Sequence, residues 1–317
     1  MDQAVTADIL ALPLHRVRLT LAFERECTLP PYPGSALRGL LGHGLRRTLC
    51  VTRRTACEGC TLQARCGYAR FFESPATGAA HRQRYAATPH AWVLHLHLPT
   101  PPRLARGESL AFDLVLMGDA GKALPWLAPA MRHAGMLGLG RDRTPFRLVT
   151  MERETPVGSA EWEPLDTSRP LPASASGIPR PPAPRRHMRI LLETPLRLKR
   201  RGRLLGPRDF SNRIFLDALR LRMRDLLALY GLAQPRLPDL PERLRPGPAP
   251  ERLAWKDWTR YSSRQRTRMQ MGGIVGEFTL DLDGLEAWWP LVWLGQWIHV
   301  GKQTSMGLGQ YRLDTSL

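Results

Sequence analysis

The sequence lacks any long hydrophobic run and any recognisable leader. No stretch approaches the roughly 20 apolar residues that a membrane-spanning helix requires, and the densest run, residues 288–300, is interrupted by Pro290 and Gln296. The N-terminus carries an acidic residue at position 2 and no basic region, which is atypical of a signal peptide. We therefore expect a cytoplasmic protein with no membrane partner.

Lysine and acidic residues are also scarce. Only four of the 46 basic residues are lysines, and the 28 acidic residues leave a net charge of 46 − 28 = +18. A charge of this size repels itself unless an anionic partner neutralises it, and nucleic acid is the partner that we favour. Codon bias in a GC-rich genome would explain why arginine replaces lysine, but it would not explain the shortage of acidic residues.

A Pro- and Ala-rich segment, residues 170–186, divides the chain into two parts with the same order of elements. Strand patterns at 17–26 and 188–198 are each followed by a helical pattern, at 35–49 and 211–230. Further strands at 110–117 and 276–282 precede helices at 124–131 and 285–298. This order predicts an α+β fold of two tandem ferredoxin-like (RRM-like) domains, residues 1–169 and 187–317, joined by a linker.

The two parts also end in similar sequence motifs. The first reads H-x-G from His133 and continues to G-L-G at Gly138–Gly140, and the second reads H-x-G from His299 and continues to G-L-G at Gly307–Gly309. Such a repeat supports duplication of one domain. The second loop contains Lys302 and glycines that let backbone amides approach phosphate oxygens. It does not have the order of a Walker A loop, so ATP is not expected.

Cysteine is rare outside one segment. Four of the five cysteines, Cys50, Cys57, Cys60 and Cys66, follow the pattern C-x6-C-x2-C-x5-C. A C-x2-C step lets two thiolates bind one metal ion from a tight turn, and four thiolates satisfy tetrahedral Zn²⁺. We expect a structural zinc ion in a small insertion at about residues 50–66, and no metal in catalysis. The alternatives are an iron–sulfur cluster and four ordinary buried cysteines, and we favour zinc over both. Cys27 is expected to be merely buried.

Two segments of the second domain are strongly basic, 197–208 and 255–268, and the second also interleaves aromatic residues with its arginines. Single-stranded bases stack on aromatic and guanidinium planes while arginines bind the phosphates, so single-stranded or hairpin RNA fits better than duplex DNA. The alternative is solvated basic loops. The candidate RNA-binding residues are Arg46, Arg47, Arg200, Arg201, Arg203, Trp258, Arg260, Tyr261, Arg264, Gln265, Arg266, Arg268, Gly301, Thr304, Ser305, Gly307 and Gly309.

Four motifs together resemble a known family. They are the P-P-Y-P-G-S-A-L-R-G segment at residues 30–39, the cysteine insertion ending in C-G-Y, the segment 260–277, and the H-V-G-K ending from His299. The chain is similar to the CRISPR-associated endoribonucleases that process precursor crRNA, in the superfamily of repeat-associated RNA-binding proteins. The resemblance implies metal-independent cleavage of CRISPR repeat RNA, often with the crRNA retained in an interference complex.

RNA cleavage without metal requires a base for the 2′-hydroxyl and stabilisation of the phosphorane, and it leaves a 2′,3′-cyclic phosphate and a 5′-hydroxyl. His43 lies outside the apolar stripe of its predicted helix, and the resemblance implies a base on this helix assisted by a preceding tyrosine, Tyr32. His299 is the second candidate base, and an arginine-driven mechanism is the third possibility. Arg38 and Lys302 are the candidate phosphate stabilisers.

Two other classes of protein compete with an endoribonuclease. A non-catalytic crRNA-binding subunit of the same superfamily would bind the repeat without cleaving it. A zinc-dependent DNA-binding regulator would prefer duplex DNA instead.

His95 and His97 alternate with leucines on a strand-like run, and we expect them to line one face of a sheet.

Overall fold

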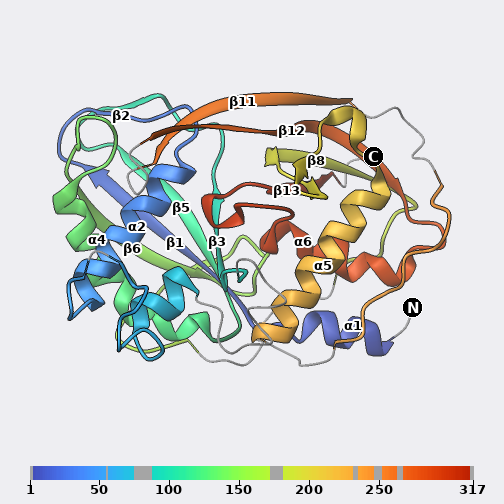
Figure 1. Cartoon of the computed structure of the whole chain (residues 1–317), viewed down its shortest axis with the longest axis horizontal. Helices are drawn as coiled ribbons and strands as arrows, with labels where there is room; N and C mark the ends of the chain where they lie inside the picture. The colour runs from blue at the N-terminus through green and yellow to red at the C-terminus, as the bar shows by residue number, and fades with distance from the viewer. Residues whose placement is uncertain are drawn as a thin grey trace. The chain divides into compact units, whose positions relative to one another are not determined.

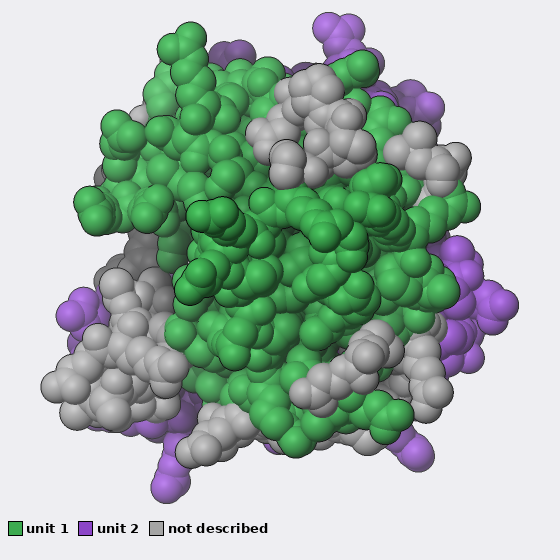
Figure 2. Space-filling view, turned by 90° about the vertical axis from the view of Figure 1, so that its right-hand side faces the viewer, with its two compact units in different colours: residues 1–12, 178–317 green, residues 13–177 purple. Residues whose placement is uncertain are grey.

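The computed structural model describes residues 3–54, 56–74, 88–171, 181–230, 235–245, 252–262 and 267–314, and it divides into two compact units. The N-terminal unit comprises residues 13–177, and the C-terminal unit comprises residues 1–12 and 178–317. Figure 1 shows the elements of each unit, and Figure 2 colours the N-terminal unit purple and the C-terminal unit green. No helix in the described ranges is both long and apolar enough to cross a membrane.

The N-terminal unit is built on an antiparallel sheet with the strand order β3-β5-β1-β6-β7. Helices α2 and α4 pack against each other, and α4 also contacts β6 (Figure 1). The elements are β1 (Leu14–Phe23), β2 (Cys27–Thr28), α2 (Gly34–Leu49), η1 (Ala69–Glu73), β3 (Trp92–Leu96), β4 (Arg103–Leu104), β5 (Ser109–Met117), η2 (Gly118–Ala123), α4 (Leu124–Leu137), β6 (Phe146–Glu154) and β7 (Trp162–Pro164).

The alternation along β1 explains how this sheet forms. Val17, Leu19 and Leu21 are fully buried, whereas Arg16 and Arg18 point to the other face and are only partly buried. Successive side chains of a strand point to opposite faces, so one face of β1 joins the apolar core while the other carries charge. The same face carries His97, as the sequence predicts, in contact with Asp113 of β5.

The C-terminal unit repeats this topology with the strand order β11-β12-β8-β13. Its core includes Phe215, whose ring meets Phe278 and Tyr311 edge-on. The elements are α1 (Gln3–Leu10), β8 (His187–Leu196), β9 (Lys199–Arg200), β10 (Arg203–Leu204), η3 (Pro207–Asp209), α5 (Asn212–Tyr230), β11 (Arg252–Ser262), β12 (Thr267–Asp281), η4 (Glu286–Trp288), α6 (Trp289–Ile298), η5 (Thr304–Met306) and β13 (Tyr311–Asp314).

Both units have the split βαβ order of a ferredoxin-like domain. Numbering the principal strands of each unit along the chain gives the spatial order 2-3-1-4, with one helix after the first strand and another after the third. The predicted α+β fold with tandem ferredoxin-like domains is confirmed.

The borders of the units differ from the predicted ranges at the N-terminus. Helix α1 belongs to the C-terminal unit, where it packs against α6 and buries Val5 and Ile9. These side chains are four residues apart and lie on one face of the helix, so the face has an apolar partner in α6. Most of the predicted linker, residues 172–180, lies outside the described residues, while the carbonyl of Pro182 accepts a hydrogen bond from Trp289 at 2.6 Å.

Candidate functional site

The C-terminal half of α2 carries a histidine and arginines on one exposed face. Arg46 and Arg47 follow His43 by three and four residues, a spacing that places side chains together on a helix. Together with Cys50, Arg53 and Leu137, these three residues line an open pocket, which we call the basic pocket. Leu37, Leu40, Leu41 and Leu45 of the same helix are buried, as the apolar stripe predicts.

The basic pocket suits a phosphate group. Three guanidinium groups line it, and no carboxylate does so in the described part of the chain. Arginine binds phosphate oxygens through paired N–H donors and remains charged at any physiological pH. Histidine is the side chain that most readily exchanges a proton near neutral pH. The pocket thus combines an exposed proton acceptor with cations that can stabilise a negatively charged intermediate.

The structure places Tyr32 and Arg38 away from this pocket. Tyr32 is buried and precedes α2, whose first residue is nine positions before His43, about 14 Å along the helix axis. Arg38 stacks on the ring of Phe72 at 4.6 Å, and its Nη2 lies 3.4 Å from Nε2 of His90. Neither side chain therefore meets His43 in the basic pocket.

His299 and the glycine-rich loop lie in the C-terminal unit. His299 caps the C-terminal end of α6 and is completely buried, and Thr304, Ser305, Gly307 and Gly309 are buried as well. Gly301 is half-buried and Lys302 is exposed. Gly309 has a φ of +71°, and a Cβ there would collide with the backbone of Val300. The loop therefore needs this glycine for close packing, and Lys302 remains its accessible cation.

The other predicted RNA-binding residues lie on two hairpins of the C-terminal unit. Arg200, Arg201 and Arg203 are exposed on the β9–β10 hairpin, where Arg203 also lies 3.5 Å from Asp209. Trp258 is half-buried on β11, and its neighbour Trp255 is 39% exposed. The backbones of Arg260, Tyr261 and Arg268 pair within the β11–β12 hairpin. Arg264, Gln265 and Arg266 lie outside the described residues.

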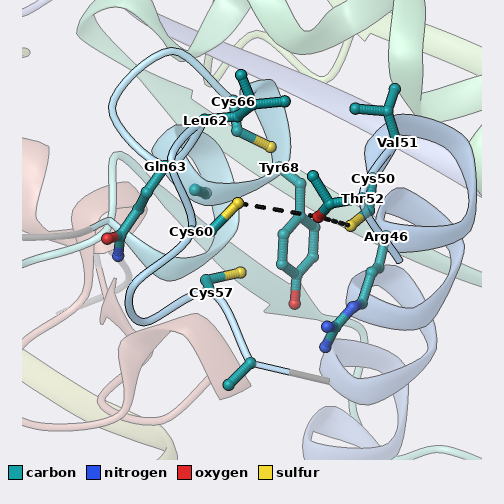
Figure 3. A pocket seen from close by; sticks show the side chains of 12 residues that line it. Arg46, Cys50, Val51, Thr52, Cys57, Cys60, Leu62, Gln63, Cys66 and Tyr68 are labelled. Atoms are coloured by element: carbon teal, nitrogen blue, oxygen red, sulfur yellow. Dashed lines mark hydrogen bonds between the residues drawn. The ribbon is translucent and has the colours of Figure 1, made fainter. Parts of the chain in front are cut away.

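The cysteine insert, residues 50–66, contributes a second pocket. Cys50, Cys57, Cys60 and Cys66 all line it, together with Arg46, Thr52 and Tyr68, and their sulfur atoms face the same space (Figure 3). The Thr52 hydroxyl lies 3.7 Å from Sγ of Cys50 and 3.8 Å from Sγ of Cys60. Across the described residues, no three His, Cys, Asp or Glu side chains are arranged as ligands of a metal ion. Cys27 is buried outside this cluster, as expected.

The pocket of the insert affects its thiols in opposite ways. Burial by itself raises the pKa of Cys50, but hydrogen bonds from the Thr52 hydroxyl and the Arg53 backbone, with the charge of Arg46, lower it below its ordinary value. The pKa of Cys57 is raised, first by burial and then by nearby acidic groups that include Glu73. The thiol beside the arginines is therefore the more readily ionised of the two.

Sequence reasoning missed Arg53 as a member of the basic pocket. Arg53 lies three residues after Cys50, which caps the C-terminal end of α2, and its backbone is in the left-handed conformation with a φ of 51°. The signal was present as two adjacent arginines, Arg53 and Arg54, inside the insert. Only the folded turn shows that the first of them lies beside His43.

The chain thus carries two ferredoxin-like units in tandem, with a basic pocket on the first helix of one unit. Residues 190–311 match the family model of the CRISPR-associated endoribonuclease Cas6, and residues 12–170 match a family model described as an N-terminal domain. The Cas6 model thus matches the C-terminal part of the chain. No curated protein matches it in sequence.

Solved structures show the same fold. A partial Cas6-RT-Cas1–Cas2 complex matches with a TM-score of 0.55 and 15% identity over 97% of this chain and 47% of that chain. A second Cas6-RT-Cas1–Cas2 complex gives the same TM-score and identity, with 29% of that chain covered. A product complex of Cas6 from Thermus thermophilus matches with a TM-score of 0.50 and 16% identity, over 95% of this chain and 99% of that one. The chain thus spans less than half the length of the first two.

Proposed function

We propose that the protein is an endoribonuclease that cleaves the repeat RNA of CRISPR precursor transcripts. The observation that carries the proposal is the basic pocket, where His43 is exposed beside Arg46, Arg47 and Arg53. The match of residues 190–311 to the Cas6 family model and the net charge of +18 agree with an RNA substrate. His299 is buried, so we assign the chemistry to His43.

In this proposal His43 acts as the general base. Its imidazole takes the proton of a ribose 2′-hydroxyl, and the 2′-oxygen attacks the adjacent phosphorus atom. The bond from phosphorus to the 5′-oxygen breaks, and the departing oxygen takes a proton from water. Arg46, Arg47 and Arg53 stabilise the negative charge that accumulates on the phosphorane. The products are a 2′,3′-cyclic phosphate and a 5′-hydroxyl, and the chemistry needs no metal ion.

We further propose that the mature crRNA stays bound and that the protein works beside other CRISPR subunits. Two structures with a similar fold are Cas6-RT-Cas1–Cas2 complexes, one of them partial. The exposed arginines of the β9–β10 hairpin, outside the proposed cleavage pocket, offer phosphate contacts that survive cleavage.

Incubation with labelled repeat RNA from the CRISPR array of the same genome tests the function. In Mg²⁺-free buffer we expect a single cut that leaves a cyclic phosphate, and no cut when the ribose at that position is replaced by 2′-deoxyribose. The deoxy substrate should still bind. Binding without cleavage of the all-ribose RNA would instead identify a non-catalytic crRNA-binding subunit. Cleavage of the deoxy substrate would contradict attack by the 2′-oxygen.

The arginines of the basic pocket should determine part of the salt dependence of RNA binding. Replacing Arg47 and Arg53 together by Ala removes two cations that line the pocket. We expect about tenfold weaker binding, and a slope of log affinity against log salt that is shallower by about 1.4, because each phosphate contact on single-stranded RNA adds about 0.7.

A matched variant controls for net charge. Arg103 and Arg106 are exposed in the same unit and do not line the basic pocket. The variant with both replaced by Ala loses the same charge, and its slope should stay within about 0.5 of that of the parent protein. If both double variants changed the slope equally, the pocket would not be a phosphate site. Filter binding at several salt concentrations measures both slopes.

A further inference from the structure

The cysteine insert has little to hold it in place. Of the described residues between Cys50 and Gly67, none is buried, and the segment contains no strand and no α-helix. Its turns are closed by short-range hydrogen bonds, such as those from the Cys60 amide to the Cys57 carbonyl at 3.1 Å and from the Cys66 amide to the Leu62 carbonyl at 2.8 Å. A segment without buried apolar surface needs another source of stability, and a bound metal ion is a common one.

The donor atoms in the insert are all of one kind. Four free thiols line the pocket, from Cys50 at the end of α2 and from Cys57, Cys60 and Cys66 in the following turns. No histidine or carboxylate joins them in the lining that the structure describes. Thiolates select Zn²⁺ over Mg²⁺ and Ca²⁺, and four thiolates complete its tetrahedron. Such a site has no open position for substrate, so its role is structural.

Two neighbours of the thiols fit this interpretation. The Thr52 hydroxyl lies within 4 Å of the sulfur atoms of both Cys50 and Cys60, so these two thiols are close to a common point. Arg46 lines the same pocket and its guanidinium lies 5.8 Å from the centre of the Tyr68 ring. Four thiolates around Zn²⁺ carry a net charge of −2, which a neighbouring guanidinium partly neutralises.

The insert and the basic pocket share residues. Arg46 and Cys50 line both pockets, and Arg53 of the insert lines the basic pocket beside His43. The position of Arg53 therefore depends on how the insert is held against the end of α2. An ion bound to Cys50 and to the three later cysteines would fix this geometry without touching RNA.

We propose that Cys50, Cys57, Cys60 and Cys66 bind one Zn²⁺ ion as thiolates, and that this ion holds the insert against the C-terminal end of α2 beside the basic pocket. On binding, the four thiols release their protons to solvent and their sulfur atoms close around the ion. The metal site stands on the cysteines alone, whereas its effect on RNA cleavage rests on the proposed function.

Metal analysis of the purified full chain tests the site. We expect about one zinc per chain, no zinc in the variant with Cys57→Ser and Cys60→Ser, and an unchanged zinc content in the control variant Cys27→Ser. Replacing Zn²⁺ by Co²⁺ should give the intense visible bands of a tetrahedral thiolate site. Absence of metal, iron in its place, or zinc that survives the double substitution would each overturn the proposal.

A reversible test on the unmodified chain avoids variants that fail to fold. Arg53, Arg54 and Arg65 are exposed in the insert, so trypsin can report on its order. After removal of zinc with a strong chelator, cleavage at these arginines should become at least about tenfold faster, because local opening exposes the backbone to the protease. Adding Zn²⁺ back should restore resistance. Equal proteolysis with and without zinc would contradict a stapling role.

RNA cleavage by the same samples separates this proposal from the proposed function. If the zinc-loaded chain cleaves repeat RNA, removal of zinc should slow cleavage in step with the loss of proteolytic resistance. A chain that binds one zinc ion but never cleaves repeat RNA supports the metal site and contradicts the endoribonuclease. A chain that cleaves repeat RNA without metal at the cysteines supports the endoribonuclease and contradicts the metal site.

Discussion

Replacing His43 by Ala should lower the rate of repeat-RNA cleavage by about 10²- to 10⁴-fold, the usual contribution of a positioned general base. RNA affinity should change by less than about twofold, because the three arginines that line the basic pocket stay in place. His43 is exposed on α2, so the substitution removes no buried side chain. Single-turnover cleavage with excess enzyme measures the chemical step directly.

A second histidine variant distinguishes a catalytic role of His43 from a general effect of losing a histidine. His187→Ala is the matched control, since His187 is an exposed histidine of the C-terminal unit, 3.9 Å from Asp281, and does not line the basic pocket. If H43A cleaves at the rate of this control, the assignment of His43 is wrong and an arginine-driven mechanism gains support.

The periodic elements of the fold could be predicted because their signals are local. The apolar stripe of the helix expected at 35–49 corresponds to α2 at Gly34–Leu49, and the alternation at 188–198 corresponds to β8 at His187–Leu196. The interleaved segment 255–268 is different. Its Trp, Arg and hydroxyl side chains do not alternate clearly between apolar and polar, so the local sequence does not predict a strand. The strand β11 forms there because it pairs with the glycine-containing strand β12, which the local sequence does not encode.

The sequence predicted the candidate site only where the geometry of one helix determines which side chains lie together. The 100° step per residue places His43, Arg46 and Arg47 together, but Arg38 lies five positions from His43, which is about 140° around the helix. The repeated G-L-G motif had a structural cause in both halves. Gly140, with a φ of +80°, approaches the carbonyl of Thr28 as Gly309 approaches Val300. The glycines thus serve close packing in both halves, and the phosphate-binding role of the second loop stays a prediction.

The charged face of the N-terminal sheet is the feature with the largest expected effect on stability. Asp113 of β5 is completely buried, and its carboxylate lies 2.6 Å from Arg16, 2.9 Å from Arg18 and 3.0 Å from His97. Trp162 of β7 covers the Arg18 guanidinium at 3.6 Å from the ring centre. Removing one partner of a buried ionic cluster leaves the others without compensation for their lost hydration.

Asp113→Asn should therefore destabilise the N-terminal unit by about 3–5 kcal/mol. The variant keeps the shape of the side chain but leaves Arg16 with Glu154, at 3.2 Å, as its carboxylate partner in this cluster. Hydrogen exchange of the β1 and β5 amides reports the opening of this unit. Asp119→Asn is the control, because Asp119 is 42% exposed and pairs with Arg70 and Lys122 at the surface. It should stay within about 0.5 kcal/mol of the parent protein.

The same carboxylate gives the prediction a pH signature. Burial by itself raises the pKa of Asp113, but the hydrogen bond from His97 and the charges of Arg16 and Arg18 outweigh burial and hold the pKa well below its usual range. A carboxyl whose pKa is lowered in the folded state stabilises the fold above its unfolded pKa of about 3.9, and this stabilisation is lost as the pH falls further. The stability difference between the parent protein and D113N should therefore be constant from pH 7 to about pH 5 and shrink below about pH 4. A difference that is equally large at low pH would show that the asparagine disturbs packing rather than removing a charge.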